Sequence, residues 1–281
     1  MAEREATLRA AWLGTALAEL REQAGLTMRQ FGKACSRHAG TISRIESGIQ
    51  PAKENDVLNY LRICNVTDTD RQARLLHVAA EVNDRGWWEG YKGSVSGTLI
   101  DRLWLEERAT AISSFETLMI PGLLQSPEYA ESIIRLENPE ASDVQLRRWL
   151  KVRMTRQHIL TNHNPSTLTS IIDESVLRRP VGGDDVMRSQ LDHLLTLGNN
   201  SHIRIHILRN SAGYCGAGAY VVLHLIEPFP VVAYTQTPLG DVCVEGSDAE
   251  SLEVRYSSVL GKALNAEQSY KVIAEARSTY E

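Results

Sequence analysis

The sequence predicts an α+β protein, with an all-α N-terminal head followed by a larger α+β domain that contains a small antiparallel or mixed sheet. Apolar residues recur at helical spacing through the first 66 residues. Short runs rich in β-branched residues begin at Thr167. The charge also changes sign: residues 1–66 carry 9 Lys/Arg and 7 Asp/Glu (+2), which leaves 21 and 28 (−7) of the chain's 30 and 35 for the rest.

The head is predicted to consist of short helices with recognisable ends. Leu13, Leu17 and Leu20 share one helical face, and Gly25 ends that helix. Thr27 is a suitable N-cap for the helix that follows. The predicted helices span residues 13–24, 27–34, 38–47 and 57–63, with a tight connection at residues 35–37.

Three parts are expected along the chain: a head over residues 1–66, a helical joint and loop over residues 67–98, and a body over residues 99–281. The loop of the joint is the Gly/Ser-rich stretch 89–97. Helices are expected in the body at residues 99–118, 127–137, 141–161, 184–198, 247–264 and 266–279. Strands are expected at residues 167–172, 203–208, 220–226 and 231–234.

Composition excludes wholesale disorder, collagen and a coiled-coil rod. The 281 residues are 43% hydrophobic and 23% charged, as in ordinary globular chains. No apolar run approaches the roughly 20 residues that span a bilayer, and the charged residues 1–5 do not resemble a signal peptide, so we expect a cytoplasmic protein without a membrane partner. The four cysteines form no C-x-x-C motif, and we expect reduced, buried thiols.

The stretch from Leu20 to Pro51 has the plan of a helix-turn-helix. Two short helices flank a turn of three to four residues, and the second has an apolar inner stripe and exposed polar residues. Residues 21–53 contain six basic and two acidic residues, a basic island on an acidic chain. Such a helix can enter a major groove about 12 Å wide, while cations contact phosphates. We therefore predict double-stranded DNA as a partner.

Two runs of this stretch resemble the Xre or phage-repressor class of helix-turn-helix regulators. Leu26–Phe31 reads LTMRQF, and Thr41–Gly48 reads TISRIESG. The resemblance implies that His38 opens the recognition helix, and that Arg21 and Glu46 form a buried, structural ion pair. It also implies that Ile42 and Ile45 are core residues. The resulting DNA-binding candidates are Thr27, Arg29, Arg37, His38, Ala39, Gly40, Thr41, Arg44 and Lys53.

Within this set we expect two roles. Base readout rests on His38, Thr41 and Arg44, because Ala39 and Gly40 are small. The candidates for phosphate contacts are Arg29, Arg37 and Lys53. Met28 stands where the class usually has a polar residue, so the alternative of a head used only for protein contacts stays open.

The rest of the chain resembles the WhiJ-like regulators of actinobacteria. The residues that carry this resemblance are Gly86–Trp88, Ile120–Ala130 and Asp173–Gly183. The resemblance implies a small acidic partner protein of the BldB-like kind. In this family, some pairs of a regulator and its partner have been likened to toxin–antitoxin modules.

Other residues allow a functional and a structural interpretation. Trp87 and Trp88 either line a ligand or partner site or, as we favour, pack the joint between domains. Asp173 and Glu174 resemble a catalytic pair, but neighbours on a strand point to opposite faces. We expect them to form salt bridges with Arg178 and Arg179.

We expect no catalytic residue, metal site or cofactor. His202 and His206 would lie about 13 Å apart on a strand, too far to share one metal ion, and the third strand histidine is His224. The glycines at 213, 216 and 218 lack the dinucleotide spacing, and residues 93–97 (GSVSG) lack the serine of a nucleophile elbow. The chain is therefore expected not to be an enzyme.

A basic run at residues 147–156 is helical and most simply forms a solvated face. Its alternative role is a docking surface for an acidic partner, for which the candidates are Arg147, Arg148 and Lys151. The function we predict is a sequence-specific transcriptional regulator that binds as a homodimer, with a body that receives a small-molecule or partner-protein signal. The alternative is an antitoxin-like interaction module in which DNA binding is autoregulation.

Overall fold

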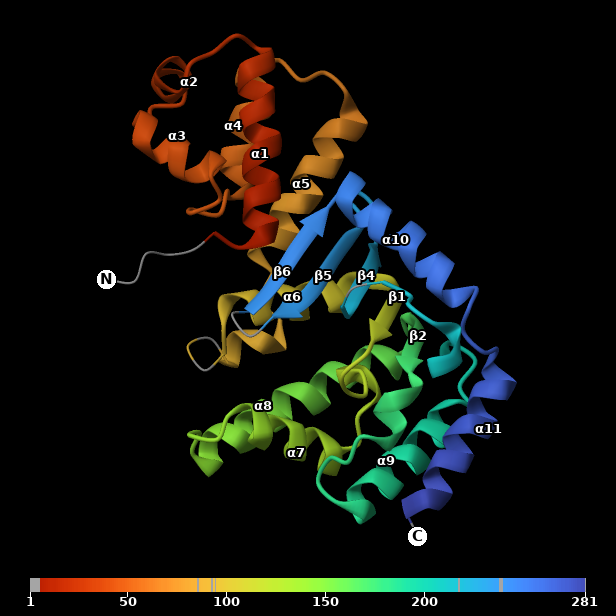
Figure 1. Ribbon diagram of the computed structural model, residues 1–281. Helices are drawn as coiled ribbons and strands as arrows, with labels where there is room; N and C mark the ends of the chain where they lie inside the picture. Colours follow the sequence, from red (N-terminus) through yellow and green to blue (C-terminus); the bar gives the residue numbers. More distant parts are fainter. Residues whose placement is uncertain are drawn as a thin grey trace. The chain divides into compact units, whose positions relative to one another are not determined.

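The computed structural model describes residues 6–84, 86–91, 93, 95–216, 218–237 and 240–280. It divides into two compact units, Met1–Arg102 and Leu103–Glu281, which are described separately (Figure 1). Residues 1–5, predicted not to be a signal peptide, lie outside the described residues, as does the Ser94 of the GSVSG loop.

The first unit is helical within its described residues. Its elements are α1 (Leu8–Gln23), α2 (Met28–Ala34), α3 (Ala39–Glu46), α4 (Glu54–Ile63), α5 (Thr69–Asn83), the 3-10 helix η1 (Trp87–Tyr91) and the start of α6 (Gly97–Arg108). The four predicted helices of the head are confirmed, although α1 begins five residues earlier than the leucine pattern indicated. The joint, expected to be a loop over 89–97, is in part the 3-10 helix η1.

Local signals explain where these helices begin and end. Thr27 and Gln30 form a reciprocal capping box at the start of α2, as the N-cap prediction for Thr27 requires. Gly25 and Gly48 follow α1 and α3 with φ of +69° and +73°, the left-handed conformation that ends helices. These ends depend on neighbouring residues only, which is why the sequence predicts them.

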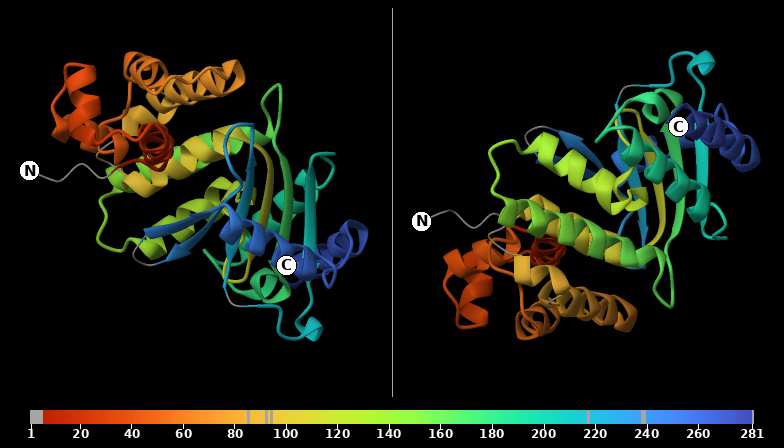
Figure 2. Two further views of the ribbon diagram at one scale, coloured as in Figure 1. Left: turned by 90° about the horizontal axis from the view of Figure 1, so that it is seen from above. Right: turned by 90° about the horizontal axis from the view of Figure 1, so that it is seen from below.

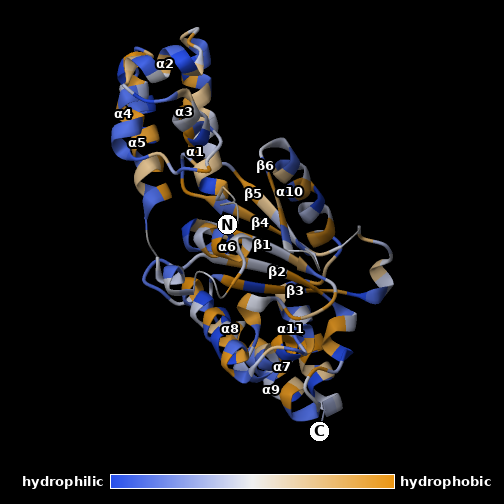
Figure 3. Cartoon of the chain, turned by 90° about the vertical axis from the view of Figure 1, so that its left-hand side faces the viewer, coloured by the Kyte–Doolittle hydropathy of each residue, from blue (hydrophilic) through white to orange (hydrophobic). Residues whose placement is uncertain are grey.

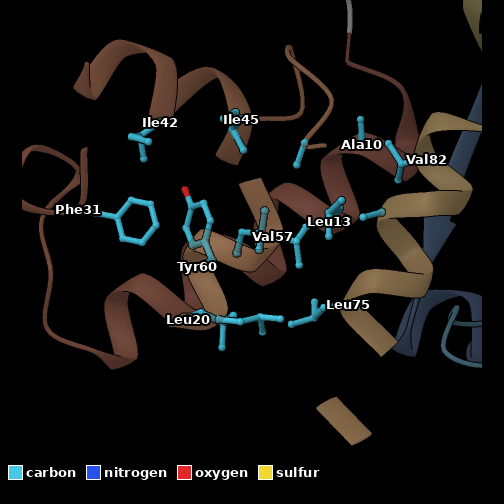
Figure 4. Close-up of a cluster of buried hydrophobic side chains, with 14 residues drawn as sticks. Ala10, Leu13, Leu20, Phe31, Ile42, Ile45, Val57, Tyr60, Leu75 and Val82 are labelled. Atoms are coloured by element: carbon cyan, nitrogen blue, oxygen red, sulfur yellow. The ribbon is translucent and has the colours of Figure 1, made fainter. Parts of the chain in front are cut away.

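The core of the first unit lies between α1, α3, α4 and α5. Phe31, Ile42 and Ile45 are fully buried in it, the two isoleucines as predicted, and Figure 4 shows them with Tyr60 of α4. Helix α5 also contributes to this core, through Leu75, Ala79 and Val82. The packed unit therefore continues beyond residue 66, where the sequence placed the end of the head.

The second unit is built on a six-stranded mixed sheet with the order β3-β2-β1-β4-β5-β6. Its strands are β1 (Ala109–Glu116), β2 (Thr167–Asp173), β3 (Ile203–Leu208), β4 (Tyr220–Leu225), β5 (Val232–Thr237) and β6 (Gly240–Glu245). Strands β1, β2 and β3 are parallel, and β4, β5 and β6 continue antiparallel from β1. The α+β prediction with a mixed sheet is confirmed.

Two strands differ from what the sequence predicts. The helix expected over 99–118 ends at Arg108, and the chain continues as β1, the strand between β2 and β4. Pairing on both sides decides the conformation of this segment, including a hydrogen bond of 2.9 Å from Ser114 Oγ to Ser170 Oγ on β2. The edge strand β6 was also missed, because its sequence GDVCVE begins with two residues that strands disfavour.

Helices cover both faces of the sheet. They are α7 (Pro127–Glu137), α8 (Asp143–Arg156), α9 (Asp184–Leu197), α10 (Ser247–Leu260) and α11 (Ala266–Arg277), each within a few residues of its predicted range. On one face Tyr256 of α10 packs with Phe115, Ile171 and Val222, and its hydroxyl donates to the Thr169 carbonyl at 2.7 Å. On the other face Glu106 of α6 accepts a hydrogen bond of 2.8 Å from Tyr234 of β5. Both views of Figure 2 show α7 and α8 together to one side of the strands, and Figure 3 shows hydrophobic stretches along the strands among paler, more polar ones.

The β3 edge of the sheet is covered at Ile207 by the loop between α10 and α11 and by the first turn of α11. Ile207 accepts a hydrogen bond of 2.9 Å from Leu264 N–H, and its own N–H donates to Ser269 Oγ at 2.9 Å. The His206 ring nitrogen Nδ1 lies 2.9 Å from the Leu264 carbonyl. These contacts occupy backbone groups that would otherwise pair with a further strand.

None of the helices in the described part of the chain combines the length and the apolar character that a bilayer span requires. None of the four cysteines forms a disulfide, but all four are half-buried, so the expectation of buried thiols was wrong in degree.

Candidate nucleic-acid interface

Helix α3, which the resemblance predicts to be the recognition helix, has two distinct faces. Ile42, Ile45 and Glu46 are buried against the core of the first unit. The opposite side is exposed and consists of Gly40, Ser43, Arg44 and Ser47, which follow the i, i+3, i+4, i+7 pattern of one helical stripe; we call these four residues the reading face. Arg44 is the one long side chain on this face, so the helix presents a slim surface that a major groove can accept.

Very close backbone contacts set α3 against its neighbours. A Cβ atom on Gly14 of α1 would lie 2.5 Å from the Glu46 carbonyl oxygen and 2.7 Å from that of Ile45. A Cβ atom on Gly32 of α2 would lie 2.6 Å from the Arg37 carbonyl oxygen in the turn. Both positions require glycine, because no side chain fits between backbones at these distances.

A buried ion pair anchors the C-terminal end of α3. Arg21 of α1 donates to both oxygens of Glu46, through Nε at 2.7 Å and Nη2 at 2.8 Å, and its Nη1 donates to the Leu26 carbonyl at 2.8 Å. The bond to Glu46 is the main reason that the pKa of Arg21 is raised. The structural role expected for this pair is confirmed.

Most predicted DNA contacts lie on or beside the reading face. His38 is the exposed N-cap residue of α3, and Ala39 and Gly40 form its first turn. The Arg44 guanidinium donates a long hydrogen bond of 3.5 Å to Thr41 Oγ1, one turn earlier on α3.

The remaining predicted contacts lie at helix starts. Arg29 is exposed in the first turn of α2, whereas the Thr27 hydroxyl is engaged in the capping box. Lys53 is exposed and precedes α4.

Arg37 differs from the other predicted phosphate contacts because it already has a protein partner. Its Nη2 lies 2.7 Å from Oδ1 of Asp56, a buried carboxylate of α4. The Arg37 side chain remains 37% exposed, so part of the guanidinium still faces solvent.

Three exposed residues of this interface are not among the predicted DNA contacts. Ser43 and Ser47 belong to the reading face, and Lys33 is exposed on α2. The helical spacing of Ser43 and Ser47 from Gly40 and Arg44 is the signal that could have identified them.

Among the other candidates, the two tryptophans pack against each other, and the acidic pair Asp173 and Glu174 contacts nearby backbone and side-chain groups. Trp88 is buried, and Trp87 packs edge-to-face against it with ring centroids 6.0 Å apart. Asp173 caps η4 (Glu174–Arg178) by accepting from Ser175 N–H at 2.9 Å, and Glu174 lies 4.0 Å from Arg209. The expected salt bridges to Arg178 and Arg179 are therefore wrong: Arg179 instead donates to the Leu118 carbonyl.

The three histidines expected on strands each have a separate partner, and His202 lies just before β3 rather than on it. His202 lies 2.8 Å from the Leu160 carbonyl, His206 contacts Leu264 as described, and His224 lies 3.0 Å from Glu253. Within the described residues no three metal-ligating side chains are grouped around one point.

The basic residues of α8 fall into two groups. Arg156 is buried and forms an ion pair of 2.8 Å with Glu106, and Arg153 donates to Gln125 at 3.1 Å. By contrast, the structure shows no ion pair or hydrogen bond to Arg147, Arg148 or Lys151 from any residue it describes, and all three are exposed. With Val144, which is 66% exposed, they form one helical stripe that we call the α8 stripe.

The fold and this interface define a helix-turn-helix DNA-binding regulator, and the helix-turn-helix domain family matches residues 12–74. The larger part of the chain, residues 99–275, matches the domain of unknown function DUF5753, and the chain belongs to this family. No curated protein and no solved structure matches the chain.

Proposed function

We propose that this chain is a sequence-specific transcriptional regulator that reads duplex DNA with the reading face of α3. One observation carries the proposal: small residues surround a single arginine on the solvent side of a helix whose other side is locked by glycine contacts and an ion pair. Arg44 then reads a base edge, for which guanine is the preferred arginine partner. Arg29, Lys33 and Lys53 supply phosphate contacts.

The test is fluorescence anisotropy of the full chain with duplexes from its own upstream region and with scrambled duplexes, at two salt concentrations. Arg44→Ala is expected to remove about 1–3 kcal/mol of discrimination at one base pair. Unchanged site preference in Arg44→Ala would remove the reading role of this residue. Binding of wild-type protein to scrambled DNA alone would contradict sequence-specific function.

We further propose that the protein binds as a homodimer. One reading face with a single long side chain contacts few bases, and a two-fold dimer doubles the number of contacts. Half-sites one helical turn apart, about 34 Å, are expected in a footprint. A footprint covering one isolated half-site would contradict the dimer.

The body is proposed to receive the regulatory signal by binding rather than by catalysis. Asp173 and Glu174, the pair that most resembled catalytic carboxylates, are engaged in a helix cap and in contacts with Arg209 and Asn210 N–H. A small-molecule effector would raise the unfolding temperature of the protein in a thermal-shift screen of metabolites.

A second candidate function is an antitoxin-like interaction module for a small acidic protein, such as the BldB-like partner that the WhiJ-like resemblance implies. The α8 stripe favours it, because three exposed cations beside an exposed valine suit an acidic surface with apolar residues. Here the expected result is co-purification with a short acidic protein encoded by a neighbouring gene. Arg147→Glu with Arg148→Glu should abolish that co-purification, whereas Arg135→Glu on α7, an exposed arginine outside the stripe, should not.

A further inference from the structure

Two side chains of α4 reach the two ends of the recognition helix. Asp56 and Tyr60 are four residues apart and so lie on the same face of α4. Asp56 pairs with Arg37, the residue before the N-cap of α3. The Tyr60 hydroxyl donates to Oε1 of Glu46, the last residue of α3, at 2.8 Å.

The Asp56 carboxylate is fully engaged. Its Oδ1 lies 2.7 Å from Arg37 Nη2, and its Oδ2 accepts a hydrogen bond of 3.0 Å from Lys53 N–H at the start of α4. The carboxylate is 4% exposed, while Arg37 is 37% exposed. Asp56 therefore holds the inner side of the Arg37 guanidinium and ties the turn before α3 to α4, while the outer side of the guanidinium stays exposed.

Tyr60 connects three helices. Its ring lies against Phe31 of α2 with centroids 4.0 Å apart, and its hydroxyl shares Glu46 Oε1 with Arg21 of α1. Figure 4 shows Phe31 and Tyr60 side by side, with the hydroxyl pointing to the side of Ile42 and Ile45. Burial and the bond to Glu46 raise the pKa of Tyr60 well above its usual range, so the hydroxyl remains protonated as a donor.

We propose that Asp56 and Tyr60 are positioning residues that set the orientation of the recognition helix on DNA. This inference rests on the proposed function. A binding surface must be held within about 0.5 Å of its productive geometry, by contacts behind the residues that touch the ligand. Without Asp56 the turn before α3 loses its ion pair to α4, and without the Tyr60 hydroxyl the Glu46 carboxylate retains only its bonds to Arg21.

The experiment uses the full chain and a duplex selected by the wild-type protein from a random library. The specificity ratio is the Kd for a scrambled duplex divided by the Kd for the selected duplex. Tyr60→Phe and Asp56→Asn are expected to lower this ratio about tenfold, with affinity for the scrambled duplex changed less than about twofold. All measurements are made at a temperature where circular dichroism shows each variant folded.

A matched control separates positioning from loss of stability. Val82→Ala removes core volume on α5, which packs mainly on α1 and α4, so it should lower the unfolding temperature and keep the wild-type ratio. A ratio that is unchanged in Tyr60→Phe and Asp56→Asn, or that falls as much in Val82→Ala, overturns the proposal.

A second set of variants covers the case in which Tyr60→Phe does not fold. Arg37→Lys keeps a cation opposite Asp56 and should retain more of the specificity ratio than Arg37→Ala, and the two losses in Arg37→Ala and Asp56→Asn should not add in the double variant. Additive losses overturn the role of Asp56. Failure of the wild-type protein to select any duplex would instead overturn the proposed function itself.

Discussion

The recognition helix α3 and the arginine-rich helix α8 make opposite use of basic residues. α3 carries one arginine, on its exposed face, and is fixed from behind by Arg21–Glu46 and by the contact at Gly14. α8 contains five basic residues, of which Arg156 and Arg153 bind other parts of the second unit. The number of cations on a helix therefore indicates little about its role, whereas the partners that each cation already has within the fold indicate a great deal.

The largest effect is expected for a buried arginine of α8. Arg156→Met leaves the buried Glu106 carboxylate without its cation, which should lower the free energy of unfolding by about 3–5 kcal/mol. Arg148→Met, on the same helix but exposed, should change it by less than about 0.5 kcal/mol. Urea unfolding followed by tryptophan fluorescence measures both, and equal losses would contradict the division of α8 into two groups.

A smaller effect is expected at the back of α3. Gly14→Ala places a Cβ atom against the Glu46 and Ile45 carbonyls and should destabilise the first unit by about 1–3 kcal/mol. Gly40→Ala has no atom within 4 Å and should be neutral or stabilising by about 0.5–1 kcal/mol, because alanine favours helix. Thermal unfolding compares the two. A destabilised Gly40→Ala would show that the reading face is packed rather than open.

The salt dependence of DNA binding tests the phosphate contacts. Lys53→Ala should weaken binding to selected and scrambled duplexes alike and reduce the slope of log K against log salt by about one. The slope comes from anisotropy titrations at several salt concentrations. An unchanged slope would remove Lys53 from the interface.

The smallest effect on DNA binding is expected for the α8 stripe. Replacing Arg147, Arg148 and Lys151 together by alanine should leave the Kd for the selected duplex within about twofold of wild type, because these residues are assigned to a protein partner. If the stripe contacts DNA instead, the salt slope should fall by about three. That result would make α8 a second DNA-binding element and end the contrast with α3.

Local signals account for what the sequence could predict. Thr27, Gly25 and Gly48 act on neighbouring backbone groups, and the helix ends that they mark lie close to their predicted positions. Strand β1 was assigned to a helix because its conformation depends on β2, which is 56 residues away in the register from Ala111 to Thr167. The sequence of residues 109–116 alone does not predict that pairing.

In the interface, too, local features were predictable from the sequence and long-range contacts were not. Arg44 was identified by motif, and its exposure agrees with a reading role. The partner of Arg37 is Asp56, 19 positions later on another helix, so its ion pair could not be anticipated from charge and position. Whether a cation is available to a ligand depends on tertiary contacts, which a linear pattern does not contain.

The loop contacts at Ile207 have a consequence for how copies of this protein behave when crowded. An open edge strand can act as a template on which another chain adds a strand, and such addition leads to aggregation. The bonds from Ile207 to Leu264 and Ser269 remove that template at the β3 edge. Extension of the sheet by a strand of another molecule is blocked at this position, and loosening the 261–265 loop should make the protein aggregate before the sheet itself unfolds.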